Sequence, residues 1–464
     1  MNIITEKPLH TFTEEAIRNY IKETVEERAI PDFKDGLKPV QRRILWAMYK
    51  LGNTHTYSYK KSARTVGEVI GKYSPHGDAG TYLAMVNMAQ ARKKYNFVDG
   101  QGNWGSYSGD PAAANRYTEA KLSELSDVCL LDKDYLKVVP LVDNFDGTEK
   151  EPVYLPSRLP FVLMGNIQGI ATAVRTGLPC FTLASLVEAC SYYLKNKTLP
   201  INALKLEFEG VYGGKCISTE EEIQKYLETG SGSLTFMPDY SIFNDRIEIT
   251  GIQDGFDFEK IITTLENLSE VKAVKDEGSK NIKVGIYFSS KKPTKQDIEK
   301  ILSVLKTKTL YSTNILNRQL AEDGSILANY KETNVIKIIQ NWCKYRIKLE
   351  RDYLTNLIGE KEKVIEYQNL LLKASQNVKI IFKALQESDP KKYLQENLKI
   401  EENQVDIILD LPIKRLSKLS EQDTKKTLDN LNRSLEELRN KRNNVIQVVI
   451  DDLSCLKRKF ADEK

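Results

Sequence analysis

Histidine, cysteine and long apolar runs are scarce in this chain, and each shortage argues against a class of protein. The 464 residues include three histidines and six cysteines. The cysteines are scattered, with no Cys-x-x-Cys pair and no nearby histidine, which disfavours zinc sites and disulfides and favours reduced, buried thiols. No apolar run is long enough to cross a membrane and no signal peptide opens the chain, so we expect a soluble, cytoplasmic protein without a membrane partner.

The usual motifs for nucleotide and metal binding are also missing. The sequence has no Gly-x-x-x-x-Gly-Lys-Ser/Thr loop, which would bind the phosphates of a nucleotide. Asp132 and Asp134 have an Asp-x-Asp spacing, but a charged surface loop explains them better, and we expect no metal site in this chain. The net charge of +4 gives no global basic field, although a concentrated basic patch remains possible.

A glycine-rich segment, Gly100-Gln-Gly-Asn-Trp-Gly105, is the most informative feature that is present. Glycines let a backbone approach a bulky anionic ligand closely. The segment is followed by Arg116 and Tyr117. Arginine offers a planar fork of donors that suits a phosphodiester, and a tyrosine hydroxyl becomes a nucleophile once its anion is stabilised. Taken alone, such a pair is more often a packing or surface feature than a catalytic one.

Amphipathic patterns predict a helical N-terminal region. Helices are expected at 13–27, 40–51, 60–70 and 79–91. Thr11 and Glu14 have the spacing of a capping box for the first helix. The apolar face of the second helix leaves Arg42 and Arg43 turned away from the core. The last two helices flank a short turn and fit a helix-turn-helix, for which an ordinary helical hairpin is the commoner alternative.

The pattern of apolar residues along the sequence changes after residue 150 and again after residue 331. From 151 to 331, short apolar segments alternate with helices, which predicts an α+β region. Strands are expected at 204–208, 233–236, 246–249 and 282–288, and helices near 182–194, 219–228, 257–267 and 294–305. From 332 to 464 the chain is almost entirely helical with heptad-like leucines and valines. Asp389-Pro390 marks a break, and a helical knot around 392–422 separates two long helices that we expect to pair antiparallel.

Several long motifs occur in one order along the chain. They are Asp35-Gly-Leu-Lys-Pro-Val-Gln-Arg-Arg43, the segment 60–78, Val98-Asp-Gly-Gln-Gly-Asn-Trp-Gly105 and Arg116-Tyr-Thr-Glu119, with Leu155-Pro-Ser-Arg-Leu-Pro160 and Ile408-Leu-Asp-Leu-Pro-Ile-Lys-Arg-Leu416 further on. The chain resembles the breakage–reunion (A) subunit of bacterial-type type IIA DNA topoisomerases. The Gln41 and Trp104 variants look more like the topoisomerase IV A subunit than gyrase A.

The resemblance implies a mixed α/β, multidomain fold. It implies an N-terminal arm and winged-helix breakage–reunion domain at 1–150, followed by an α+β tower domain at 151–331. A long antiparallel coiled-coil arm with a small helical dimer (exit) gate would occupy 332–464.

The resemblance also implies a catalytic site. Tyr117 would attack a DNA phosphodiester and become linked to the 5′ phosphate. Arg116 and Arg28 would stabilise the developing charge, while Lys38 and His76 would hold phosphates or assist proton transfer. From the residues alone, Arg28 could instead be a helix C-terminal charge and His76 a hydrogen-bonding group in its turn.

The basic residues on the flanks of the predicted helix-turn-helix favour DNA as its ligand, and they are Lys60, Lys61, Arg64 and Lys72. The full set expected to contact DNA adds Arg42, Arg43, Ser74 and Ile170. Ile170 matches the apolar wedge that the family inserts between base steps. Ser74 stands where the family usually has a histidine, which puts the proton pathway in doubt. Ala79 and Leu83 occupy positions where relatives have a serine and an acidic residue that engage fluoroquinolones, so we expect low quinolone sensitivity.

Partners and cofactors follow from the resemblance as well. We expect double-stranded DNA as substrate, a homodimer through the gate, and an ATPase–TOPRIM subunit, like the B subunit of gyrase or topoisomerase IV, that completes an A2B2 tetramer. Mg²⁺ and ATP are expected on that partner subunit. Because no β-pinwheel repeats follow the second arm helix, relaxation and decatenation are expected rather than negative supercoiling. The sequence leaves open whether the chain ends naturally at residue 464 or is truncated there.

Two alternatives from other classes remain. One is a catalytically silent, DNA-binding dimeric scaffold with the same fold. The other is a stand-alone tyrosine nickase or recombinase, which leaves the coiled-coil arm unexplained. A requirement for a second, ATP-hydrolysing protein would separate the topoisomerase from the nickase.

Overall fold

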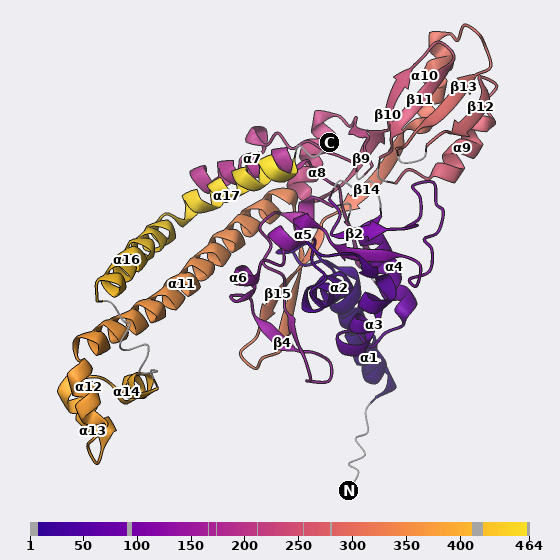
Figure 1. Cartoon of the computed structure of the whole chain (residues 1–464). Coiled ribbons are helices and arrows are strands. Elements are labelled where there is room, and N and C mark those ends of the chain that lie inside the picture. Colours follow the sequence, from indigo (N-terminus) through magenta and orange to yellow (C-terminus); the bar gives the residue numbers. More distant parts are fainter. Residues whose placement is uncertain are drawn as a thin grey trace. The chain divides into compact units, whose positions relative to one another are not determined.

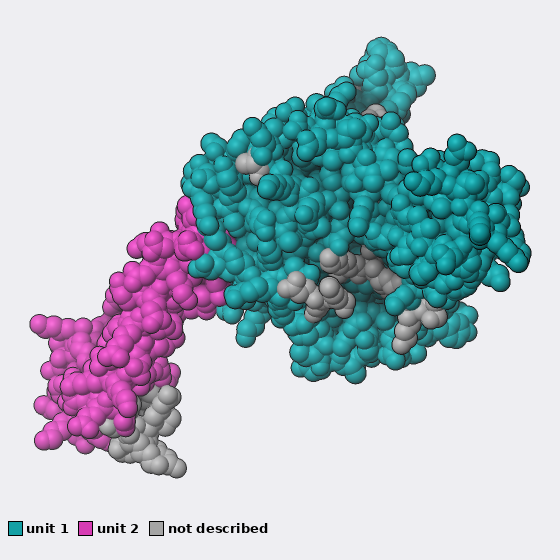
Figure 2. Space-filling view, turned by 90° about the horizontal axis from the view of Figure 1, so that it is seen from above, with its two compact units in different colours: residues 1–346, 450–464 teal, residues 347–449 magenta. Residues whose placement is uncertain are grey.

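The computed structural model describes residues 8–90, 95–165, 167–172, 174–210, 212–253, 255–278, 281–410 and 421–461. The chain forms two compact units, residues 1–346 with 450–464 and residues 347–449 (Figure 2). Helices and several sheets alternate along it (Figure 1), so the expected mixed α/β fold is confirmed. The three-part division at residues 150 and 331 stays a prediction.

The first unit begins with helices that surround a small sheet. These elements are α1 (Leu9–Thr24), the π-helix η1 (Val25–Ala29), α2 (Pro39–Lys50), α3 (Ser62–Lys72) and α4 (Asp78–Ala89). Helix α2 packs against α3 and α4. The antiparallel sheet has the order β1-β3-β2, with β1 at Lys60–Lys61, β2 at Val98–Gln101 and β3 at Glu119–Leu122. The expected capping box is wrong, because Pro8 caps α1 and Thr11 lies inside the helix.

Short elements connect this region to the sheets that follow. They are α5 (Glu124–Cys129), α6 (Lys133–Leu136), β4 (Leu141–Asp143), β5 (Lys150–Pro152) and the 3₁₀ turn η2 (Phe161–Leu163). Asp132 caps α6, since its carboxylate accepts a hydrogen bond of 2.9 Å from the Asp134 amide. The surface-loop interpretation is therefore wrong for these two aspartates, because Asp132 is a helix cap and Asp134 lies in the first turn of α6.

A five-stranded sheet with the order β6-β7-β14-β9-β8 follows. Its strands are β6 (Ile167–Ala171), β7 (Val174–Leu178), β8 (Lys215–Cys216), β9 (Ser231–Met237) and β14 (Thr307–Ser312). The associated helices are α7 (Leu183–Asn196), the 3₁₀ turn η3 (Ile201–Ala203) and α8 (Glu220–Thr229). The expected strand at 204–208 is wrong. Only Phe208 forms a bridge, to Phe181, because the segment has no neighbouring strand along most of its length.

A four-stranded lobe and a hairpin complete the first unit. The lobe has the order β10-β11-β13-β12 and comprises β10 (Asp239–Ile242), β11 (Arg246–Gly251), α9 (Phe258–Glu266), β12 (Val271–Asp276), β13 (Val284–Phe288) and α10 (Lys295–Leu305). Its own apolar core includes Ile247, Ile286 and Ile301. The hairpin pairs β15 (Asn314–Leu320) with β16 (Ile326–Glu332). The expected strands at 233–236, 246–249 and 282–288 correspond to β9, β11 and β13 and are confirmed.

The second unit is helical. It contains most of α11 (Val335–Gln376) and the whole of α12 (Val378–Ala384), α13 (Pro390–Leu398), α14 (Glu402–Leu409) and α16 (Glu421–Asn443). Within it, α11 and α16 run antiparallel, since Gln376 bonds Glu421 and Arg439 pairs with Glu362. The long helix ends at Gln376, before the expected break, although Pro390 does begin α13. Part of the expected knot, 411–420, lies outside the described residues.

The last helix, α17 (Val445–Phe460), returns to the first unit for residues 450 onward. Asp452 accepts hydrogen bonds from Arg158 and Arg346 at 2.5 and 2.8 Å. Burial alone would raise the pKa of Asp452, but hydrogen bonds and charge from the two arginines outweigh it and hold the pKa below its ordinary value. These ion pairs fix the end of the chain to the first unit.

Two whole-chain expectations can be compared with the described residues. No helix among them has the length and apolarity needed to cross a bilayer. All six cysteines are free, and four are buried, but Cys455 is exposed and Cys216 is half-buried. The expectation of buried thiols is therefore wrong for Cys455, because it lies on the outer face of α17.

Candidate functional site

Tyr117 lies on the loop between β2 and β3 and points outward. Its side chain is 63% exposed, and the guanidinium of Arg116 lies over its ring, 4.7 Å from the centroid. A cation at that distance stabilises the negative face of the ring, and it would also stabilise a nearby anion. The structure thus brings the two predicted residues together at a solvent-facing position.

The backbone on both sides of Tyr117 is held by α3 and α4. The amide of Ser62 donates to the carbonyl of Thr118 at 3.0 Å, and the buried Thr118 hydroxyl donates to Ser62 Oγ at 2.8 Å. The hydroxyl of Tyr82 donates to the carbonyl of Ala113 at 2.6 Å. Tyr117 is therefore an exposed side chain on an anchored backbone, which is the arrangement a positioned nucleophile requires.

The glycine-rich segment is tight because of its own packing. A Cβ on Gly100 would collide with the indole of Trp104, which is buried. Gly105 has φ +84°, and its Cβ would lie 2.7 Å from the carbonyl oxygen of Asp110. Both glycines are needed to fold the loop that carries Tyr117, so the structure explains them without a bound ligand.

A second group gathers along β6. Arg28 is exposed on η1, and η1 packs so closely on β6 that a Cβ on Gly169 would meet the carbonyl of Ala29. Lys38 Nζ donates to the carbonyl of Gln168 at 2.7 Å, and burial lowers the pKa of Lys38. Ile170 is 82% exposed on the same strand. Two cations and an apolar side chain therefore share one strip of surface.

Lys38 also borders a cavity of about 460 Å³, together with Gln41 and Gln168. Within the described ranges, no hydrogen bond or ion pair joins Lys38 or Arg28 to Tyr117. The structure therefore places Arg116 with Tyr117, and Arg28 and Lys38 along β6, while His76 lies apart on the turn between α3 and α4.

The turn between α3 and α4 carries His76 and Ser74. His76 is exposed, and its amide donates to the carbonyl of Ser74 at 2.7 Å. Ser74 itself is buried, and its amide donates to the carbonyl of Val69 at the end of α3. The turn closes over Ser74, so its expected DNA contact is not supported, whereas His76 remains available.

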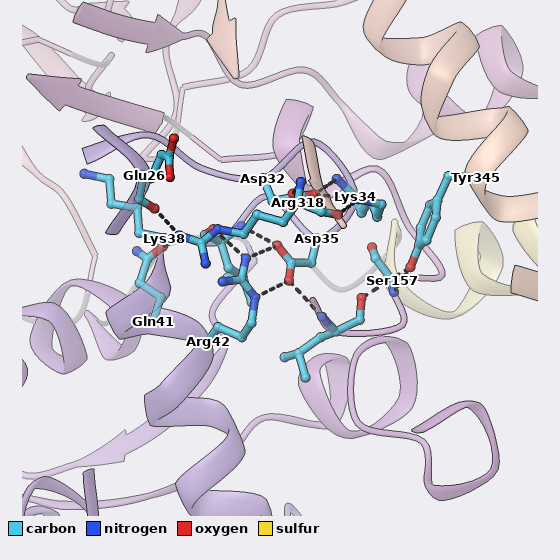
Figure 3. A network of polar contacts seen from close by, with 12 residues as sticks. Glu26, Asp32, Lys34, Asp35, Lys38, Gln41, Arg42, Ser157, Arg318 and Tyr345 are labelled. Carbon is cyan, nitrogen blue, oxygen red and sulfur yellow. Dashed lines mark hydrogen bonds and ion pairs between the residues drawn. The ribbon is translucent and has the colours of Figure 1, made fainter. Parts of the chain in front are cut away.

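The expected outward orientation of Arg42 is wrong. Arg42 is 3% exposed and forms a bidentate ion pair with Asp35, with Nε–Oδ2 and Nη2–Oδ1 distances of 2.7 and 2.9 Å (Figure 3). Asp35 in turn accepts from the amides of Leu37 and Leu155. The helix pattern placed Arg42 on the polar face, but Asp35 lies beside that face and buries the guanidinium.

The other cations that were expected to contact phosphate differ in their exposure and in whether an acidic residue already pairs with them. Arg43 is half-buried and makes a bidentate pair with Glu151 at 2.7 and 2.9 Å. Lys61 is exposed but paired with Glu119 at 2.9 Å. Lys60 and Arg64 are exposed and form no ion pair with any residue that the structure describes.

Lys72 is likewise engaged. Its ammonium pairs with Glu68 at 2.9 Å and with Glu149 at 3.2 Å, and the hydrogen bonds that it donates to these two carboxylates raise the pKa of Lys72. The three side chains are half-buried, so Lys72 is exposed only in part and its charge is already balanced by the two carboxylates.

Sequence reasoning missed the residues that hold the η1 segment. Arg318 on β15 donates to the carbonyl of Glu26, and its amide donates to the buried Asp32 (Figure 3). Its guanidinium also donates to the carboxylate of Glu27. Lys34 Nζ donates to Asn317 Oδ1 at 2.9 Å. The only available signal was the charged run that begins at Asp32, because its partners lie far away in the sequence.

Metal-binding side chains do not converge among the described residues, where no group of three or more His, Cys, Asp or Glu residues could hold a metal ion. Ala79 and Leu83 both lie exposed on α4. The expected low quinolone sensitivity stays a prediction.

The fold and the site together define a class of protein. It is a multidomain α/β protein in which an exposed arginine–tyrosine pair lies beside exposed cations. Residues 28–454 match the family model for the A subunits of DNA gyrase and topoisomerase IV, and the chain belongs to this family. The resemblance drawn from the motifs is thereby confirmed.

Individual relatives are similar over nearly the whole chain. The DNA topoisomerase 4 A subunit of Haemophilus influenzae is 34% identical over 92% of this chain and 58% of its own length. The gyrase A subunits of Staphylococcus epidermidis and Ureaplasma parvum are each 32% identical over 99% of this chain and over 53% and 56% of their own lengths. The chain therefore spans about half the length of the curated relatives it matches.

Proposed function

We propose that this chain is the DNA-cleaving subunit of an ATP-dependent type IIA topoisomerase. The observation that carries the proposal is the exposed Tyr117 under the Arg116 guanidinium, on a backbone that α3 and α4 hold in place. Family membership adds support, since the relatives are named as A subunits of gyrase and topoisomerase IV.

The proposed reaction is a transesterification. The phenolic oxygen of Tyr117 attacks a backbone phosphorus, the bond to the 3′ oxygen breaks, and that oxygen leaves as a 3′ hydroxyl with the proton that the phenol gave up. The 5′ phosphate remains on the tyrosine, so the reverse attack reseals the strand without an external energy source.

The surrounding cations have separate roles in this proposal. Arg116 stabilises the phenolate and the charge that develops on the phosphate. Arg28 and Lys38 bind phosphates along β6, and His76 assists proton transfer. Lys60, Lys61, Arg64 and Lys72 position the backbone of the duplex, whereas Arg42 and Ser74 are buried and are left out.

Ile170 is proposed as the side chain that enters a base step. An apolar residue that is 82% exposed at the tip region of a strand costs free energy in water, and insertion between bases would bury it. Helices α2–α4 with the β1-β3-β2 sheet form the proposed winged-helix domain. The five-stranded sheet and the lobe form the proposed tower, and α11 to α16 form the proposed arm and gate.

The proposal includes a two-fold assembly. One tyrosine cuts one strand, so a double-strand break needs two copies of the chain. We place ATP hydrolysis and the Mg²⁺ site on a B-type ATPase–TOPRIM subunit, giving an A2B2 tetramer, and expect relaxation and decatenation rather than negative supercoiling.

The test compares wild type, Tyr117→Phe and Tyr57→Phe, each with a matched B-type subunit, Mg²⁺, ATP and supercoiled plasmid. Tyr57 is as exposed as Tyr117, at 63%, and serves as the matched control. After a detergent quench, linear DNA with covalently bound protein should form with wild type and Tyr57→Phe only. DNA binding and dimerisation without covalent product in any variant would favour the silent scaffold.

A further inference from the structure

Tyr107 connects the loop that carries Tyr117 to a different part of the first unit. It lies just after the glycine-rich segment, and its hydroxyl donates to Asp276 Oδ1 at 2.6 Å. Asp276 is the last residue of β12, in the lobe formed by β10–β13, α9 and α10 (Figure 1). The contact therefore joins two segments that are far apart in the sequence.

The ring of Tyr107 is also held by the lobe. It packs edge-on against Phe258, with a centroid distance of 5.6 Å and an interplanar angle of 81°, and it lies against the apolar core of the lobe. Gly278 leaves room for the Tyr107 hydroxyl, because a Cβ at position 278 would lie 2.6 Å from the hydroxyl oxygen. The Gly278 amide donates to the same oxygen of Asp276 at 2.9 Å, which fixes that carboxylate.

The loop can transmit a displacement from Tyr107 to Tyr117. A turn closes it between Ser106 and Asp110, whose side chains bond at 2.8 Å. The Ala113 amide then donates to the carbonyl of Asn103 at 3.0 Å. These hydrogen bonds link Tyr107 to the part of the loop that carries Tyr117, so we expect a displacement of one to be felt by the other.

The lobe carries exposed positive charges that suit the binding of a polyanion. Lys272 and Lys275 are exposed on β12, next to Asp276 in the strand. A duplex that reaches the lobe would therefore bind beside the residue that holds Tyr107.

We infer that Tyr107 is a positioning residue, which couples engagement of DNA by the lobe to the placement of Tyr117. The inference rests on the proposed function. Tyr107 acts through the loop and does not touch the reacting atoms.

The test uses the full chain and begins without DNA. Tyr107→Phe removes the hydroxyl and keeps the ring, and Asp276→Ala removes the acceptor. Tyr287→Phe is the matched control, because its hydroxyl donates to Glu277 in the same lobe, and no hydrogen bond joins it to residues 103–117 in the part of the chain that the structure describes. Hydrogen exchange is measured for the amides of residues 103–117, with α2 as an internal check of folding.

We expect roughly three- to tenfold faster exchange in the loop for Tyr107→Phe and Asp276→Ala, as for loss of one hydrogen bond. Tyr287→Phe and Asp276→Asn, which keeps an acceptor oxygen, should match wild type. With the B-type subunit and plasmid, the covalent product should fall by a similar factor while the Kd for DNA changes less than twofold. The double variant Tyr107→Phe/Asp276→Ala should be no worse than either single one.

The outcomes separate the two proposals. If wild type forms no covalent product, the proposed function fails, whatever the exchange data show. If wild type cleaves DNA, and Tyr107→Phe matches it in both loop hydrogen exchange and covalent product, the positioning role is overturned. Faster loop exchange with unchanged cleavage would overturn the coupling to Tyr117.

Discussion

Replacing Arg42 by methionine separates a structural arginine from a DNA-binding one. The substitution leaves the Asp35 carboxylate, which is fully buried, with only two backbone donors, from Leu37 and Leu155. Removing one partner of a buried ion pair costs about 3–5 kcal/mol. At roughly 2 °C per kcal/mol for a large domain, the unfolding midpoint of Arg42→Met should fall by about 6–10 °C.

Thermal unfolding by circular dichroism gives the midpoint, and titration of duplex DNA at several salt concentrations gives the slope of log K against log salt. Arg64→Ala is the control, since Arg64 is exposed on α3. It should leave the midpoint almost unchanged and reduce the salt slope by about 0.9. A reduced slope for Arg42→Met, with an unchanged midpoint, would refute the buried ion pair as the role of Arg42.

Four further substitutions test particular features of the structure. Gly36→Ala would place a Cβ 2.5 Å from the amide of Val162 at φ +69°, so we expect loss of folded protein in expression trials. Gly52→Ala, at φ +64° with no described atom within 4 Å of the new Cβ, should lower the free energy of unfolding by only about 1–2 kcal/mol. Equal yields of folded protein for the two variants would contradict this difference. Because the pKa of Asp452 is held below its ordinary 3.8, its stabilising effect is complete above that pH and is lost as pH falls through the folded pKa. Asp452→Asn should therefore lower the unfolding midpoint at pH 7 and flatten its acid dependence, and an unchanged acid profile would be evidence against these ion pairs. Ile170→Ala should leave the midpoint unchanged and reduce DNA bending, measured by energy transfer between the duplex ends, whereas undiminished bending would exclude the wedge.

Local pattern predicted the elements of this fold well, and tertiary contacts account for the errors. Helices α2 to α4 and α7 to α10 were predictable because their apolar periodicity lies within each segment. Helices α7 to α10 also begin at a capping threonine or aspartate. The segment 204–208 has a strand-like pattern but no partner strand along most of its length. Pairing is a property of the neighbours, so the sequence of the segment could not reveal it.

The candidate site was predictable to a similar degree. The pair Arg116–Tyr117 came from one motif and lies together in the structure. The anchors of its backbone, such as Ser62 and Tyr82, come from other elements and carry no local signal. Arg318 was missed for the same reason, since its partners precede it by almost the length of the first unit.

Counting basic residues in motifs overestimates the cations that can meet DNA. Arg42 and Arg43 belong to one motif in the sequence, yet Asp35 and Glu151 neutralise both. The free energy of those ion pairs stabilises the fold and is not available for binding phosphate. Exposed cations such as Arg64 remain, and the proposed function gives them a modest number of phosphate contacts. We therefore expect the proposed DNA binding to depend on salt less steeply than the motifs suggest.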